Sequence, residues 1–268
     1  MARQPLVVEP GTQVNLADFD PRFKGDFNKS SAKEALKSLQ KKMRALQRRL
    51  YAEGQQSLLI VLQAMDAGGK DSTIRHVFHG VNPQGVHVAS FKKPTEKELA
   101  YDFLWRVHPH VPRKGQIAIF NRSHYEDVLV VRVNNLVPEA TWRARYDHIN
   151  NFEKLLVDNG THILKFFLQI SREEQKERFQ SRLDDPEKHW KFSKWDLPVR
   201  TQWDDYMRAF EDAITACNTE YAPWYIIPAD RKWYRNLVVT QAIVETLEAM
   251  NPQFPPPEDG LDQIIIPD

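Results

Sequence analysis

The segment from Leu58 to Thr73, LLIVLQAMDAGGKDST, constrains the possible folds of this chain more than any other. Its apolar beginning, residues 58–62, is typical of a strand buried in a parallel sheet. Residues 64–69 then predict a tight turn, and a helix is expected from Asp71. Backbone N–H groups of such a turn and of the helix N-terminus face the same side, where they can bind a phosphate anion. The ammonium group of Lys70 would add a positive charge there.

The turn departs from the phosphate-loop pattern GxxxxGK(S/T) at two positions. Ala64 replaces the first glycine, and Asp71 replaces the hydroxyl residue that binds magnesium. Asp66 lies inside the turn, where a carboxylate opposes anion binding unless a cation lies between them, so we expect it to bind Mg²⁺ or to act as a general base. An ordinary strand–turn–helix with a surface lysine, and an Asp66 bonded only to its own backbone, remain alternatives. The other residues expected to contact phosphate are Ala67, Gly68, Gly69, Asp71 and Ser72.

Length and composition set the limits for the rest of the chain. With 268 residues, 41% of them hydrophobic, the chain can bury one large α/β core, and nothing requires a second domain. The formal net charge is only +1, so affinity for a polyanion must come from local clusters among the 37 basic residues. Cys217 is the single cysteine, which excludes a disulfide framework and a cysteine zinc site. Without a long apolar run or a secretory leader, we expect a cytoplasmic protein with no membrane partner.

Apolar strand-like runs alternate with helical patterns along the chain, as in βαβ units that build a parallel sheet. Residues 1–30 predict an extended arm, residues 31–250 a single domain, and the proline-rich residues 251–268 a tail that is not helical. The predicted elements are a helix capped by Ser31 and Glu34 that reaches about Glu53, strands at 86–90, 116–120, 162–170 and 224–227, and helices that begin near Thr95, Pro138, Ser171 and Lys232.

A second group of polar residues follows the apolar strand in IAIFNRSHYED, residues 117–127. Such a strand presents its last residues at the carboxyl edge of a parallel sheet, where these folds bind ligands. We therefore expect Asn121, Arg122, Glu126 and Asp127 beside the phosphate turn. Most phosphate-loop enzymes place a metal-binding aspartate where this chain has Asn121, so Asp127 or Glu126 would supply the missing carboxylate. Alternatively, Arg122 and Asp127 form a weak surface ion pair.

A third feature is the segment LDDPEKHWKFSKWDLPVR, residues 183–200, which interleaves basic and aromatic residues. It is compatible with a nucleic-acid surface, with a solvated loop, or with a mobile lid over a phosphorylated substrate. Next to a phosphate site the lid is favoured, with Lys191 and Lys194 inside it. Arg178 and Arg182, one turn apart on the preceding helix, would face the same anion. Further candidates for a basic groove are Arg75, Lys92 and Lys93, of which the two lysines equally fit a solvated turn before Pro94.

Five ordered blocks, AMDAGGKDST, FNRSHYEDVLVVRV, LKFFLQIS, RLDDPEKHWKF and APWYIIPADRKWYRN, together resemble the second family of polyphosphate kinases over about residues 30–250. The resemblance implies a thymidylate-kinase-like P-loop fold, α/β, in which helices flank a parallel β-sheet and a helical lid covers the site. It also implies Mg²⁺-dependent transfer of phosphate between inorganic polyphosphate and nucleotides, and assembly as a homo-oligomer, a dimer or tetramer. Asp66 and Lys70 match the family's phosphate-loop carboxylate and lysine, Arg122 its strand-end arginine, and the segment around Lys191 its lid.

One departure from the family pattern bears on the substrates. Many members read Phe-Asp-Arg-Ser-Trp-Tyr-Asn-Arg where residues 120–127 here read FNRSHYED, a form that resembles the subgroup that phosphorylates both AMP and ADP. The expected nucleotides are therefore AMP, ADP and ATP. The expected catalytic residues are Asp66, Lys70, Asn121, Arg122 and Glu126, with Asp66 and Asp127 as metal ligands.

Two other functions remain open from the sequence. One is a conventional nucleoside or nucleotide kinase that uses ATP as donor, since it needs the same turn and lid. The other is a non-catalytic module that binds polyphosphate or nucleic acid. Asp66 argues against simple anion binding, and no nucleic-acid partner is expected.

Overall fold

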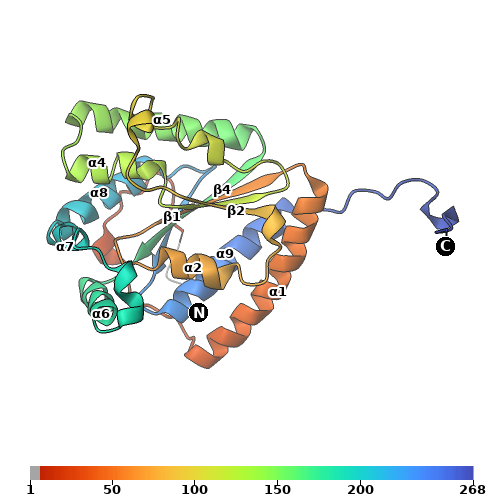
Figure 1. Ribbon diagram of the computed structural model, residues 1–268, viewed down its shortest axis with the longest axis horizontal. Helices are drawn as coiled ribbons and strands as arrows, with labels where there is room; N and C mark the ends of the chain where they lie inside the picture. Colours follow the sequence, from red (N-terminus) through yellow and green to blue (C-terminus); the bar gives the residue numbers. More distant parts are fainter. Residues whose placement is uncertain (1–6, 268) are drawn as a thin grey trace.

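The computed structural model describes residues 7–267 and contains a five-stranded parallel sheet between two layers of helices (Figure 1). The strands lie in the order β2-β3-β1-β4-β5, so β1 is central, which is the arrangement expected of a P-loop kinase fold. Helices α1, α2 and α9 cover one face, and α4, α5 and α8 cover the other (Figure 1). The strands are β1 (Ser57–Gln63), β2 (Val86–Ser90), β3 (Ile117–Asn121), β4 (Thr161–Gln169) and β5 (Trp224–Pro228).

The helices account for most of the remaining chain. The α-helices are α1 (Lys29–Glu53), α2 (Lys70–Val77), α3 (Glu96–Leu99), α4 (Val130–Val133), α5 (Glu139–Asp158), α6 (Arg172–Leu183), α7 (Asp196–Thr201), α8 (Trp203–Ala216) and α9 (Lys232–Met250). The 3-10 helices are η1 (Leu16–Asp18), η2 (Pro83–Gly85), η3 (His108–His110), η4 (His124–Asp127), η5 (Pro186–Lys191) and η6 (Leu261–Gln263). No helix in residues 7–267 is long and apolar enough to cross a membrane.

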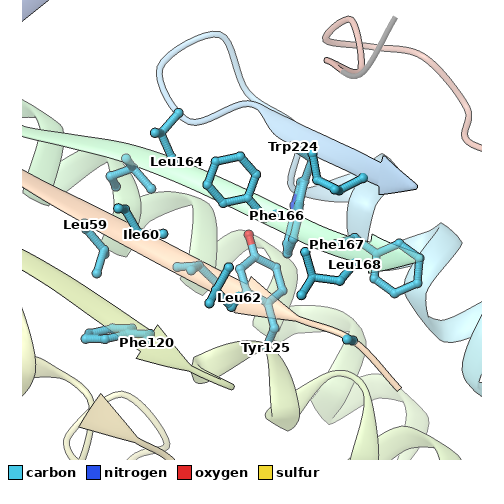
Figure 2. Close-up of a cluster of buried hydrophobic side chains, with 14 of the residues drawn as sticks. Leu59, Ile60, Leu62, Phe120, Tyr125, Leu164, Phe166, Phe167, Leu168 and Trp224 are labelled. Carbon is cyan, nitrogen blue, oxygen red and sulfur yellow. The ribbon is translucent and has the colours of Figure 1, made fainter. Parts of the chain in front are cut away.

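The core lies on both sides of the central strands. Every residue of β1 is buried, as expected for a strand with helices on both faces. Phe120, Phe166, Phe167 and Trp224 fill the space between the strands and the helices that cover them (Figure 2). Burial of each large apolar side chain stabilises the fold by about 1.5–3 kcal/mol. This packing gives the carboxyl ends of the strands a rigid support.

The first helix begins earlier than predicted. Asn28, rather than Ser31, is the N-cap of α1, and its side-chain oxygen accepts hydrogen bonds from the N–H groups of Ser30 and Ser31, both at 2.9 Å. The Ser31 hydroxyl in turn accepts a bond from the Asn28 N–H at 3.1 Å. Ser31 is thus the second partner of a capping box and not its first residue, so the predicted cap at Ser31 and Glu34 is wrong.

The other predicted elements are present with small shifts. The strand predicted at 116–120 runs from 117 to 121, and the final helix has the predicted bounds. The helix predicted to begin near Thr95 is present and starts with a capping box of Thr95 and Glu98, but α3 ends after one turn. At the start of the described arm, Val7 forms an antiparallel bridge with Tyr225 of β5, and the N–H of Val8 donates to the carbonyl of Trp224 at 2.9 Å. The arm therefore pairs with part of this edge strand, which would otherwise offer unpaired backbone groups.

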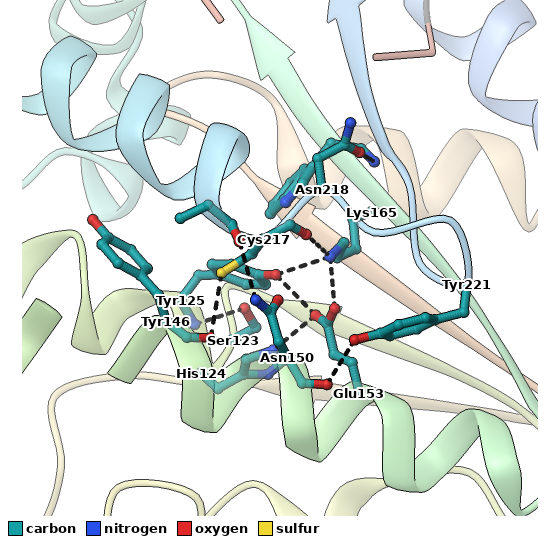
Figure 3. A network of polar contacts seen from close by, with 12 residues as sticks. Ser123, His124, Tyr125, Tyr146, Asn150, Glu153, Lys165, Cys217, Asn218 and Tyr221 are labelled. Carbon is teal, nitrogen blue, oxygen red and sulfur yellow. Dashed lines mark hydrogen bonds and ion pairs between the residues drawn. The ribbon is translucent and has the colours of Figure 1, made fainter. Parts of the chain in front are cut away.

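A buried ion pair at the centre of the molecule ties three elements together (Figure 3). Lys165 of β4 donates to Glu153 of α5 at 2.6 Å and to the Tyr125 hydroxyl at 3.0 Å, and all three side chains are buried. Tyr125 donates to the other oxygen of Glu153 at 2.9 Å. Burial raises the pKa of Glu153, but the charge of Lys165 and the hydrogen bonds that Glu153 forms with His124 and Lys165 outweigh it and hold the pKa below its usual range. Because Tyr125 belongs to η4, the ion pair anchors that short helix to β4 and α5.

We predict that Lys165→Met lowers the free energy of unfolding by about 3–5 kcal/mol, because it leaves the Glu153 carboxylate buried without its ammonium partner. Urea denaturation measures this difference. Lys154→Met is the matched control, since Lys154 lies on the surface of α5 with its side chain 50% exposed, and it should change stability by less than about 0.5 kcal/mol. Equal effects of the two substitutions would show that the buried pair contributes nothing specific.

Candidate active site

The phosphate turn, residues 64–69, joins β1 to α2 and has the backbone that an anion site needs. Gly69 is the N-cap of α2 at φ 101°, and it contributes no side chain to cap the helix. A Cβ atom at Gly68 would lie 2.5 Å from the Cβ of Ala64, so only glycine fits there. Ala67 adopts φ 60°, a conformation that costs energy for a residue with a side chain. The first N–H groups of α2 are therefore free of side-chain caps and face a binding site.

Lys70 begins α2 and turns back over the phosphate turn. Its side chain is buried, and its Nζ donates to the carbonyl of Ala64 at 2.9 Å. Burial, helped by the nearby charge of Arg122, lowers the pKa of Lys70 to about 8. The ammonium group thus lies in the turn, and no carboxylate of the described part of the chain is bonded to it.

Arg122 connects the two sequence motifs. It follows β3 with φ 61°, a strained conformation for arginine, and this directs its side chain back toward the phosphate turn. Its Nη2 lies 2.6 Å from Asp66 Oδ1, and its Nη1 lies 3.7 Å from Glu126 Oε2. The Glu126 charge raises the pKa of Arg122. Burial raises the pKa of Glu126, although Arg122 and Lys70 oppose this shift. Two carboxylates and one guanidinium therefore meet at the end of β3.

Two other residues of this motif take different positions. Asn121 ends β3, and its side-chain amide donates to the Asp71 carboxylate at the start of α2. Asp127 does not lie beside the turn as expected, because its carboxylate bonds to Arg145 Nη1 of α5 at 3.1 Å. In a 3-10 helix, successive side chains point about 120° apart, so Glu126 and Asp127 of η4 cannot face the same site. The alternative pair of Arg122 with Asp127 is not formed either.

A cavity of about 910 Å³ opens over the phosphate turn, and we call it the basic cavity. Eleven lysine or arginine residues line it, against five aspartate or glutamate residues. The chain as a whole carries only +1, so positive charge is concentrated here. The basic residues of the lining are Lys70, Arg75, Lys92, Lys93, Arg122, Arg178, Arg182, Lys188, Lys191, Lys232 and Arg235.

Most of the predicted site residues line this cavity. Residues 66–72 and Asn121 belong to the lining, together with all the predicted cations except Lys194. Three predicted residues do not, namely Glu126, Asp127 and Lys194. Glu126 lines a neighbouring cavity instead, and Lys194 lies on an exposed part of the predicted lid.

Arg178 and Arg182 of α6 serve the site in different ways. Arg178 is buried and donates to the carbonyl of Ala67 in the phosphate turn at 2.9 Å, while its Nε bonds to Glu174 at 2.7 Å. Arg182 donates to the carbonyl of Lys191 at 3.0 Å. The first arginine thus braces the turn, and the second connects α6 to the segment 183–200.

The second cavity, of about 160 Å³, lies next to the first, and we call it the apolar cavity. Asp66 and Arg122 line both cavities and so lie at their junction. The other residues that line the apolar cavity are Ala64, Met65, Glu126, Leu129, Val130, Asn134, Val199, Tyr206 and Phe210.

Sequence reasoning missed the contribution of α9. Lys232, Arg235 and Asn236 line the basic cavity from the first two turns of this helix. The available signal was the position of basic residues directly after the last strand, because the carboxyl end of β5 lies at the same edge of the sheet as the phosphate turn.

The carboxylates present suit a metal ion that is shared with a substrate. Across residues 7–267, no three or more His, Cys, Asp or Glu side chains gather so that they could hold a metal by themselves. Mg²⁺ in phosphate-transfer sites is commonly held by only one or two carboxylates together with substrate phosphates and water. Asp66 and Glu126, which share Arg122, supply hard oxygen ligands of this kind.

Comparison with known proteins agrees with this geometry. Residues 26–255 match the family described as polyphosphate kinase 2. This chain belongs to the polyphosphate kinase 2 family. It is 58% identical to an AMP/ADP-polyphosphate phosphotransferase of Meiothermus ruber, over 97% of this chain and 98% of the relative. It is 44% identical to an ADP-polyphosphate phosphotransferase of Rhodopseudomonas palustris, over 92% and 90% of the two chains.

A solved structure supports the same assignment. The crystal structure of polyphosphate kinase 2 from Arthrobacter aurescens TC1 superimposes with a TM-score of 0.93 at 40% sequence identity, over 96% of this chain and 93% of that one. The predicted fold class and family are therefore confirmed, and the polyphosphate kinase 2 fold extends over almost the whole chain.

In this polyphosphate kinase 2 we expect anion binding to weaken as the pH rises through about 8, because Lys70, with a pKa of about 8, then loses its charge. Calorimetric titration with tripolyphosphate as a function of pH measures the association constant. Arginine keeps its charge over this range, so Lys70→Arg should remove the decline. Lys154→Arg, on the surface, is the control. A decline that persists unchanged in Lys70→Arg would assign the titration to another group.

Proposed function

We propose that this protein is an enzyme that transfers phosphate between inorganic polyphosphate and nucleotides, converting AMP to ADP and ADP to ATP in reversible reactions. The observation that carries the proposal is the junction of two unlike cavities at Asp66 and Arg122, one basic and one largely apolar. Its relatives in the family are named for phosphate transfer between polyphosphate and AMP or ADP.

The basic cavity suits a long polyanion better than a single phosphate. Its cations extend from Lys92 and Lys93 after β2, across the phosphate turn, to Lys188 and Lys191. A chain of phosphates has a regular negative charge along its length, and such a row of cations can neutralise it in successive contacts. We therefore assign this cavity to the donor, with Lys70 and Arg122 nearest the transferred phosphate.

The apolar cavity suits the nucleotide that accepts the phosphate. Leu129, Val130 and Phe210 offer apolar surface to a base, and Glu126 and Asn134 offer polar groups. A nucleotide whose base entered here would direct its phosphates toward Arg122 at the junction. Alignment of donor and acceptor and neutralisation of charge are the main requirements of phosphoryl transfer.

Lys70 and Arg122 then act directly on the reaction. The Lys70 ammonium and the Arg122 guanidinium stabilise the negative charge on the transferred phosphoryl group as it passes between the cavities. Mg²⁺, when bound, neutralises the phosphate oxygens. We assign its protein ligands to Asp66 and Glu126, replacing the predicted Asp127, because Asp127 is occupied by Arg145.

Asn121 and Glu126 are the proposed basis for use of both AMP and ADP. An acceptor site that serves both must hold the reacting phosphate at two distances from the base. Asn121 adds no charge at the end of β3 and bonds to Asp71, whereas Glu126 places a carboxylate beside Arg122. These two residues lower the net positive charge of the acceptor site, so the site would not strongly prefer ADP, the more anionic acceptor, over AMP.

The segment 183–200 is the proposed lid. It contains η5 and α7, lines the basic cavity through Lys188, Trp190 and Lys191, and exposes 78% of Trp190 and 81% of Trp195. Closure over bound phosphate would bury these residues and exclude water. We further propose that residues 31–250 form the catalytic domain between an arm and a tail, and that the enzyme acts as a homo-oligomer in the cytoplasm.

The decisive experiment is incubation of the purified protein with AMP, Mg²⁺ and long-chain polyphosphate, without ATP. We expect ADP to appear first and ATP later, because both nucleotides enter the same apolar cavity. Chromatographic separation of the products over time measures this. Glu126→Gln should lower total transfer, because Glu126 is also an assigned Mg²⁺ ligand, and should in addition change the ratio of AMP to ADP use, whereas Glu187→Gln, on the outer part of the lid, should change neither. Formation of ADP alone would contradict dual acceptor use.

The same assay excludes the rival functions. A conventional kinase would make product only when ATP is added as donor. A binding module would hold polyphosphate with strongly salt-dependent affinity and form no nucleotide product. Transfer of phosphate from polyphosphate without ATP would therefore exclude both the conventional kinase and the binding module. A requirement for ATP would contradict the proposed function.

Asp66→Asn keeps the shape of the side chain and removes its charge, so we predict a loss of at least about a hundredfold in rate together with loss of the Mg²⁺ response. Initial rates over a range of Mg²⁺ concentrations measure both effects. Binding of tripolyphosphate without Mg²⁺ should be retained or strengthened, because a carboxylate has left the cavity. An Asp66→Asn enzyme with a normal Mg²⁺ response would move the metal to other ligands.

A further inference from the structure

Arg235 of α9 lies directly behind the phosphate turn and is completely buried. A Cβ atom at Gly69 would lie only 2.0 Å from its Nη1 and 3.2 Å from its Cζ. The guanidinium therefore reaches the turn only because residue 69 has no side chain. Arg235 also belongs to the lining of the basic cavity.

The guanidinium of Arg235 is bonded on one side only. Its Nε and Nη2 donate to Asn236 Oδ1 at 3.1 and 2.8 Å, and Nη2 also donates to the Ser72 hydroxyl at 3.0 Å. Its Nη1 is buried and has no hydrogen-bond partner within residues 7–267. The bonded groups are all neutral.

Among the residues that the structure describes, no carboxylate pairs with the charge of Arg235 either. Burial, together with the like charge of Arg178, lowers the pKa of Arg235 to about 9. Arg122 and Arg178, in contrast, each have a carboxylate within 2.7 Å. A buried charge without a partner is costly for the free protein, and native structures rarely keep one without a functional reason.

We propose that Arg235 is a phosphate-binding residue whose counter-ion is the donor chain itself. A phosphate that binds over the turn brings negative charge close to the buried guanidinium, whose Nη1 lies directly behind Gly69. Binding of polyphosphate then neutralises the buried charge. The free-energy cost that Arg235 imposes on the free protein is thereby removed, which favours binding. The inference rests on the assignment of the basic cavity to polyphosphate.

Arg235 should serve the donor rather than the acceptor. It lines the basic cavity and is not among the residues of the apolar cavity. Its contact with Ser72 and its approach to Gly69 place it on the α2 side of the turn, whereas Asp66 and Arg122 form the junction. Substitution should therefore affect the KM for polyphosphate and leave the KM for AMP almost unchanged.

The test is Arg235→Gln, which removes the charge and keeps an amide that can donate to Asn236. We expect the association constant for tripolyphosphate to fall about tenfold to a hundredfold, as for loss of a hydrogen bond to a charged group. The KM for polyphosphate should rise by a similar factor, and the KM for AMP should stay within about twofold. Arg208→Gln is the control, because Arg208 lies on the surface of α8 and its side chain is 62% exposed.

Thermal unfolding separates this function from a structural one. If Arg235 binds phosphate, Arg235→Gln should leave the Tm of the free protein unchanged or raise it, because the uncompensated buried charge is removed, and it should reduce the rise in Tm on addition of tripolyphosphate. If Arg235 only braces α9 against the turn, the variant should lose Tm in the free state and keep the full rise, and the proposal is overturned.

Arg235→Lys decides the matter if the glutamine variant does not fold. Lysine keeps the charge but cannot bond to Asn236 and Ser72 in the same way. The proposal requires that Arg235→Lys keep most of the affinity for tripolyphosphate, and a loss as large as that in a neutral variant, Arg235→Met, overturns it. Wild-type protein that binds tripolyphosphate but forms no nucleotide product would overturn the proposed function while leaving this binding test valid.

Discussion

The register of β1 against its two neighbours is the constraint on which the site depends. Leu62 of β1 lies opposite Asn121 of β3 and Phe166 of β4, and the N–H of Arg122 donates to the carbonyl of Leu62 at 3.1 Å. The chain that leaves β3 is therefore held against the last residues of β1, just before the phosphate turn. A shift of one residue would turn the side chains of the strand to the other face of the sheet and would separate Arg122 from Asp66.

The cations of the site are of two kinds: some are paired with a carboxylate, and others are not. Arg122 and Arg178 each have a carboxylate partner, so they hold the turn and η4 in place before any substrate binds. Lys70 and Arg235 are buried and, within residues 7–267, neither is bonded to a carboxylate, and burial lowers the pKa of both. Anion binding at the turn would relieve that cost, which is the physical basis of the proposed phosphate site.

The buried Lys165–Glu153 pair connects the core to the chemistry. Tyr125 bonds to both members of the pair, and the next residue along η4 is Glu126. A buried ion pair is weak evidence for stability, but it restricts the arrangement of the groups that it joins. In this protein it restricts the element that presents a carboxylate to Arg122, so a rigid polar core supports the proposed acceptor and metal site.

The local patterns of the sequence determined the elements and the family. Buried strands, capped helices and the turn around Lys70 could be predicted because each depends on residues that are neighbours along the chain. The positions of Asp127 and Arg235 relative to the site could not be predicted from the sequence. Which face of a short 3-10 helix meets the site, and which helix passes behind the turn, depend on contacts between residues far apart in sequence. Asp127 bonds to Arg145 of α5 and so does not face the site. Arg235 lies against Gly69 only because α9 packs beneath the phosphate turn.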